Sequence, residues 1–187
     1  VTRTSRAYHI LRRVGSFSSG ALDCLFPRIC VGCGRIGDYV CARCSAHLPR
    51  LDGPLCPHCG QPQASGILCP TCAASVSSLS AIRSVFRFEG TVRAAVHELK
   101  YRNLRAIAPC LAAYMCAYMA EWGPEPELVV PVPMHSRHQH RRGYNQAELL
   151  ARALARSQGL AFRAALKRTS GQASQVRSRS VSERHRN

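Results

Sequence analysis

The residues best placed to do chemistry are cysteines, because eight of the eleven fall into four Cys-x-x-Cys pairs. A two-residue spacer lets both sulfurs of one pair reach the same metal ion. Two such pairs complete the four-thiolate tetrahedron that structural Zn²⁺ prefers. The sequence therefore predicts two structural zinc ions, held by Cys30, Cys33, Cys41, Cys44, Cys56, Cys59, Cys69 and Cys72.

Two glycines favour a sequential pairing of these ligands. Gly34 follows the first pair and Gly60 follows the third. Glycine tolerates the left-handed backbone that turns amides toward the sulfurs of a zinc knuckle. The simplest interpretation is two consecutive ribbons, in which the first pair joins the second and the third joins the fourth. A crossed arrangement of the pairs stays open as an alternative.

Disulfides and a redox dithiol are the other uses of such cysteines. Disulfides need an exported chain, and residues 14–20 are too polar for the core of a signal peptide. A redox motif is normally a single pair at a strand-to-helix junction, not four pairs in tandem. The sequence has no run of 18 apolar residues that could span a membrane. We therefore expect zinc ligands in a cytoplasmic chain.

Positive charge is concentrated toward the end of the sequence. The net charge is +16, and residues 129–187 carry twelve Lys and Arg against two Asp and Glu. Such a field attracts polyanions through an electrostatic term that is independent of their sequence. We expect phosphate-bearing partners, meaning nucleic acid, another polyanion or phosphorylated small molecules, rather than a merely solvated basic surface.

The basic residues crowd one predicted loop, 134–142, which follows an apolar strand over 128–133. A second metal site is disfavoured there, because three arginines repel a cation. Arginine guanidinium groups and exposed backbone amides can instead donate hydrogen bonds to phosphate oxygens. A helix N-terminus, which also favours anions, follows the loop. The residues predicted to bind phosphate or nucleic acid in this region are His135, Arg137, Arg141, Arg142, Gly143, Asn145 and Gln146.

Alternating strand and helix patterns must position this loop. They predict an α/β fold with a mostly parallel sheet, whose ligands bind at the carboxyl ends of the strands. Asn145 and Glu148 resemble a capping box at the start of one helix. The predicted strands are 84–89, 128–133 and 160–166, and the predicted helices are 92–99, 109–122 and 145–158. The predicted domains are a lead-in over 1–29, a double zinc ribbon over 30–72, a linker over 73–80 and the α/β domain over 81–187.

The order of these motifs resembles the ComF family of competence proteins. The resemblance rests on the four cysteine pairs, then Phe-Arg-Phe-Glu-Gly, Glu-Leu-Lys-Tyr, Val-Pro-Val-Pro and Arg-Gly-Tyr-Asn-Gln-Ala. It implies a double zinc ribbon joined to a type I phosphoribosyltransferase-like domain that handles single-stranded DNA in natural transformation, with a partner protein of the competence machinery as a further expectation. It also implies a mobile loop that closes over phosphoribosyl pyrophosphate, matched best at Arg168, Thr169, Gln172, Arg184 and Asn187.

One element of that family is missing from the printed sequence. Type I transferases hold the ribose hydroxyls with two adjacent carboxylates, yet no two acidic residues are adjacent here. We therefore expect an incomplete transferase-like domain with no catalytic residues and poor binding of phosphoribosyl pyrophosphate, in a chain that ends before the motif. Mg²⁺ would accompany that substrate only in a longer form. The alternatives are an active transferase in that longer form, and a non-catalytic zinc-ribbon module that binds nucleic acid or protein.

Overall fold

A computed structural model describes residues 27–74, 77–122 and 126–168. The chain divides into two units, Val1–Pro124 and Glu125–Asn187. Each unit is described below by itself.

Several predictions lie outside the described residues. They are most of the lead-in over 1–29 and the loop residues Thr169, Gln172, Arg184 and Asn187. The predicted domain limits also remain a prediction.

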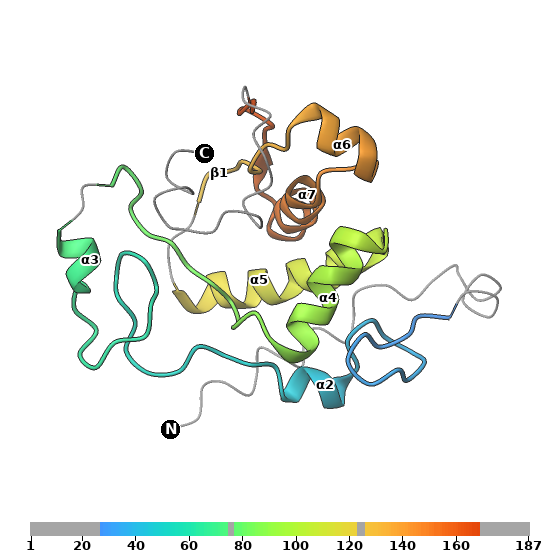
Figure 1. Ribbon diagram of the computed structural model, residues 1–187, viewed down its shortest axis with the longest axis horizontal. Helices are drawn as coiled ribbons and strands as arrows, with labels where there is room; N and C mark the ends of the chain where they lie inside the picture. The colour runs from blue at the N-terminus through green and yellow to red at the C-terminus, as the bar shows by residue number, and fades with distance from the viewer. Residues whose placement is uncertain (1–26, 75–76, 123–125, 169–187) are drawn as a thin grey trace. The chain divides into compact units, whose positions relative to one another are not determined.

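Two short ribbons with little regular structure open the first unit (Figure 1). Helix α2 (Ala42–Ala46) belongs to the first ribbon and helix α3 (Pro70–Ala73) belongs to the second. Both helices are too short to supply a core, so the ribbons depend on their cysteines. Each ribbon contains one isolated antiparallel bridge, between Ile29 and Ile36 in the first and between Leu55 and Pro62 in the second.

Helices α4 (Gly90–Tyr101) and α5 (Ala108–Trp122) complete the first unit, joined by the 3₁₀ turn η2 (Arg105–Ile107). Both helices were predicted from the spacing of their apolar residues. The buried positions of these two helices and of η2 include Ala95, Leu99, Ile107, Ala108, Ala112 and Tyr114.

The strand predicted over 84–89 is wrong. This segment is irregular, and its Arg87 amide donates to the Pro49 carbonyl at 2.8 Å. Its alternating pattern has a different cause. The Phe86 ring packs edge-on against Tyr114 of α5, with ring centroids 5.5 Å apart. The half-buried Phe86 side chain thus packs on a helix rather than on a neighbouring strand.

The second unit contains a small parallel sheet. Strand β1 (Leu128–Val129) pairs with β2 (Ala161–Phe162), and Leu128 lies opposite Ala161. Both strands lie where the sequence predicted them but are shorter than predicted. Helices α6 (Ser136–Arg142) and α7 (Gln146–Gln158) lie between the strands in sequence, and α7 packs on both strands. The predicted fold class is confirmed, with an N-terminal double zinc ribbon followed by helices and a parallel α/β element.

The loop predicted over 134–142 is wrong, because most of it forms helix α6. The helix ends at Gly143, whose φ of 81° is a left-handed conformation that glycine adopts without strain. The capping box is half correct. Asn145 accepts a hydrogen bond from the Ala147 amide at 3.0 Å and so caps α7. Glu148 instead pairs with Arg152, one turn along the same helix, at 2.7 Å.

Candidate metal centres

The eight cysteines form two clusters of four sulfurs, and the pairing is sequential. Within each cluster all four Sγ atoms lie within 4.8 Å of one another. The Sγ atoms of Cys33 and Cys41 are 3.5 Å apart, and those of Cys59 and Cys69 are 3.8 Å apart. A tetrahedron with Zn–S bonds of about 2.3 Å has sulfur-to-sulfur edges of about 3.8 Å. Both clusters therefore fit a structural zinc ion.

The two ribbons repeat the same knuckle. In the first, the Gly34 amide donates to the Cys30 carbonyl and the Cys30 amide donates to the Arg35 carbonyl, both at 2.8 Å. In the second ribbon the same bond closes the turn 26 residues later, from the Gly60 amide to the Cys56 carbonyl at 3.0 Å. Both glycines have positive φ, 75° and 71°. The left-handed turns predicted at Gly34 and Gly60 are therefore present in both ribbons.

Backbone amides converge on the sulfurs. The Cys41 amide donates to the Cys30 Sγ at 3.4 Å, and the Cys69 amide donates to the Cys56 Sγ at 3.5 Å. The amides of Cys59 and Cys69 lower the pKa of the Cys56 thiol to about 6. Burial, together with hydrogen bonds shared among the sulfurs, raises the pKa of the Cys72 thiol to about 12. One thiol of the cluster ionises readily and another resists, so a cation is needed to hold all four as thiolates.

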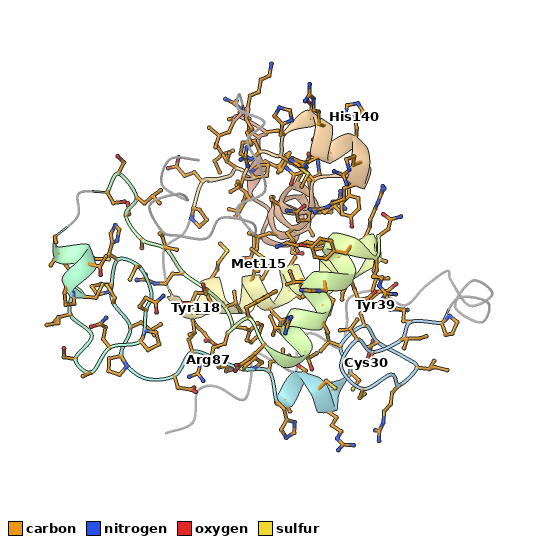
Figure 2. All side chains as sticks on the ribbon, viewed as in Figure 1. Cys30, Tyr39, Arg87, Met115, Tyr118 and His140 are labelled. Carbon is orange, nitrogen blue, oxygen red and sulfur yellow. The ribbon has the colours of Figure 1, made fainter. Side chains whose placement is uncertain are left out.

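The first ribbon is anchored to the helices of its unit. The Tyr114 hydroxyl of α5 donates to the Ser45 Oγ at 2.8 Å. Gly32 passes so close to α4 that a Cβ there would lie 2.6 Å from the Thr91 Oγ1. Val40, just before the second cysteine pair, is 8% exposed. In Figure 2, Cys30 and Tyr39 lie in this ribbon, on the α4 side of the unit.

The second ribbon is attached differently, to the irregular segment that follows it. The His58 Nε2 donates to the Leu79 carbonyl at 2.9 Å, and the Ile82 amide donates to the His58 carbonyl at 2.6 Å. Arg83 adds a bond from its Nη2 to the Pro57 carbonyl, at 2.7 Å. Leu68 occupies the position equivalent to Val40, yet it is 48% exposed. Equivalent positions in the two ribbons therefore have different surroundings.

The predicted phosphate-binding residues cluster on and beside α6. Arg137 and Arg141 are exposed on the helix. His140 is exposed on the same helix (Figure 2). The His135 Nδ1 accepts from the Arg137 amide at 3.2 Å, and so caps α6. Gly143 ends the helix.

Other predicted residues are engaged within their own unit. The Arg142 Nη1 donates to the Gln146 Oε1 at 2.6 Å. Asn145 is buried, and its Nδ2 donates to the Val132 carbonyl at 3.0 Å in addition to capping α7. Arg168 lies beyond β2 and is half-buried.

Sequence reasoning missed a row of aromatic rings at α4. The rings of Phe88 and His97 have centroids 6.0 Å apart, and those of His97 and Tyr101 are 5.3 Å apart. The spacing of four residues between His97 and Tyr101 places them on one helix face and was a usable signal.

Comparisons with known proteins agree with the zinc sites. The family described as "Double zinc ribbon domain" matches residues 21–73. Competence protein ComFC of Bacillus subtilis is 28% identical over 126 residues, which cover 64% of this chain and 52% of that protein. DNA utilization protein YhgH of Salmonella typhi is 32% identical over 129 residues, covering 66% of this chain and 56% of that protein. YhgH of Escherichia coli strain K12 is 28% identical over 139 residues, which cover 71% of this chain and 60% of that protein.

The chain thus spans little more than half the length of these relatives. No solved structure matches it. Within the described residues, every helix is too short or too polar to cross a membrane.

Proposed function

We propose that this chain, which belongs to the ComF family of competence proteins, binds single-stranded DNA in the course of DNA uptake. The zinc ribbons stabilise the first unit, and basic residues of the second unit contact the DNA. The names of the relatives, competence protein and DNA utilization protein, support DNA as the ligand.

The observation that carries this proposal is the composition and exposure of α6. Five of its seven residues are Arg or His, and none is acidic. Arg137 and Arg141 are four residues apart, so their side chains rise from neighbouring positions on one exposed face. His135 and Arg142, at the ends of the helix, extend the same basic surface. Arg168 is a further candidate for phosphate contact.

Such a surface binds the phosphate chain rather than the bases. Each arginine that neutralises a phosphate releases a condensed counterion, so the affinity falls as salt rises. For single strands the slope of log affinity against log salt is roughly −0.7 for each phosphate contact. Removing two contacts should therefore flatten that slope by roughly 1.4.

The test measures fluorescence anisotropy of a labelled thymidine oligomer with the zinc-loaded chain over a range of salt. We expect the affinity of the unchanged chain to fall steeply as salt rises. The double variant Arg137→Ala with Arg141→Ala should bind more weakly at low salt and show the flatter slope.

A matched control separates position from net charge. Arg156→Ala with Arg163→Ala removes the same charge from exposed positions of the same unit, away from α6. This control should retain most of the affinity. An affinity that does not change with salt concentration would contradict the proposal. Equal losses of affinity in the α6 variant and in the control would also contradict it.

Phosphoribosyl pyrophosphate is the second candidate ligand, from the transferase-like part of the resemblance. We propose that this stretch of chain binds it weakly and does not transfer its ribosyl group. Its printed sequence has no adjacent acidic pair to hold the ribose hydroxyls, and positioning supplies much of the barrier reduction in such reactions. Calorimetry with this compound and Mg²⁺, against a pyrophosphate control, tests the point. Tight binding that is selective for the sugar phosphate would contradict it.

A further inference from the structure

A row of exposed rings lies at helix α4. Phe88 precedes the helix, and His97 and Tyr101 follow one turn apart on it. The three rings are in contact in sequence order, with centroid distances of 6.0 Å and 5.3 Å. Phe88 is 58% exposed and Tyr101 is 62% exposed. Folding therefore leaves most of this aromatic surface outside the core.

The exposure follows from the two faces of α4. Ala95 and Leu99 are 1% exposed and pack into the core of the unit. His97 and Tyr101 each lie two residues further along, on a different side of the helix. The ring row thus lies largely outside the core that Ala95 and Leu99 form. Burial in the core therefore does not explain the presence of these aromatic side chains at α4.

Cationic side chains share this face. An open groove of about 360 Å³ runs along α4, lined among others by Arg93, His97, Tyr101 and Arg102. Over residues 87–105 there are five Lys and Arg against two Glu. An exposed row of rings with basic side chains beside it is the composition of a single-strand binding surface. The rings offer faces to bases, and the arginines offer positive charge to phosphates.

We propose that this face of α4 is a stacking platform for the bases of single-stranded nucleic acid. Bases stack on Phe88, His97 and Tyr101, and Arg93 and Arg102 neutralise the phosphates that link them. The occupant is a single strand rather than a duplex, because paired bases have no free faces. Stacking is tolerant of sequence, so the platform accepts any base. The inference rests on the proposed function and adds base contacts to the phosphate contacts of α6.

The experiment compares two probes of equal length, a thymidine oligomer and an abasic oligomer that keeps the phosphates without bases. The platform variant carries Phe88→Ala, His97→Ala and Tyr101→Ala. Alanine substitution of stacking residues weakens binding by several-fold to a hundredfold for each base. We expect the platform variant to lose about tenfold or more on the thymidine oligomer and nothing on the abasic one.

The matched control is Ile67→Ala, Leu68→Ala and Leu79→Ala, which trims three exposed apolar side chains of the same unit that carry no ring. It should bind both probes like the unchanged chain. Circular dichroism checks that both variants are folded. If the platform variant fails to fold, Tyr101→Phe and Tyr101→Leu give the same test at one site. The phenylalanine should keep the affinity and the leucine should lose it.

The outcomes separate the two proposals. If the unchanged chain binds both probes equally, or if the platform variant binds the thymidine oligomer at full strength, the platform is wrong while phosphate binding by α6 stands. A duplex bound as tightly as the single strand would also overturn the platform. If the unchanged chain binds neither probe at low salt, the proposed function fails, and the platform fails with it.

Discussion

The two zinc ribbons share one local design but differ in their attachments, so equivalent substitutions should have unequal effects. Cys33→Ser and Cys59→Ser each remove one ligand at positions 26 residues apart. We expect each variant to lose one zinc ion. The first substitution should destabilise helices α4 and α5 more than the second, because among the described residues the hydrogen bond from α5 and the close approach to α4 both involve the first ribbon.

The magnitude follows from the contacts that the first ribbon makes. The hydrogen bond from Tyr114 to Ser45 contributes about 1 kcal/mol net. Burial of Val40 adds roughly 2 kcal/mol. Release of the first ribbon should therefore lower the free energy of unfolding of the helices by roughly 3 kcal/mol, a large share of the 5–15 kcal/mol typical of a domain.

Among the described residues, the second ribbon makes weaker contacts with the helices. Its hydrogen bonds join His58 and Pro57 to the irregular segment that follows it. Leu55 lines a small cavity beside Tyr114 and Tyr118 of α5. Its loss should change the stability of the helices by less than about 1 kcal/mol.

Urea unfolding followed by far-ultraviolet circular dichroism reports the helices directly, and metal analysis counts the zinc ions. The two variants serve as controls for each other, because both exchange a knuckle sulfur for a hydroxyl. Equal shifts of the unfolding midpoint would refute the reasoning, since the first ribbon would then hold the helices no better than the second. Retention of both zinc ions in either variant would refute the ligand assignment.

Three further predictions test the same unit. Gly32→Ala should cost about 1–3 kcal/mol of stability, because its Cβ would lie 2.6 Å from the Thr91 Oγ1, and Thr91→Ala should recover part of that loss in urea unfolding. Val40→Ala should cost about 2 kcal/mol, whereas Leu68→Ala at the equivalent exposed position should stay within about 0.5 kcal/mol in the same assay. Burial raises the pKa of the Cys110 thiol to about 11, so near pH 8 its alkylation, followed by mass spectrometry, should be about a hundredfold slower in the folded chain than in urea.

The zinc sites could be predicted from sequence because their geometry is local. A Cys-x-x-Cys spacer and a following glycine fix the turn over a few residues, without help from distant contacts. The glycines favoured the sequential pairing but left a crossed one open, and the two sulfur clusters decide between them. The ends of α7 were equally local, since Asn145 and Gly159 supply a cap and a left-handed stop within one turn of the helix.

Of the two mispredicted elements, one depends on a neighbour distant in sequence and the other on a local cap that composition did not reveal. The segment 84–89 has a strand pattern but finds no strand to pair with, because Phe86 packs on α5 instead. The segment 134–142 is polar enough to resemble a loop, yet α6 forms there. Its start is capped by the side chain of His135, a residue that composition assigned to phosphate binding.

The internal repeat shows why even a correct local prediction leaves function open. Val40 and Leu68 hold the same place in two ribbons built by the same backbone bonds, yet one is buried and the other is half exposed. The backbone bonds that the two ribbons share do not account for this difference. The difference comes from α5, whose Tyr114 contacts the first ribbon through Ser45. The zinc site thus fixes the local backbone of a ribbon, whereas the elements packed beside the ribbon decide which of its side chains are buried. The same reasoning applies to α4. Because Ala95 and Leu99 pack into the core, the ring row is exposed, and two of its rings line an open groove together with arginines.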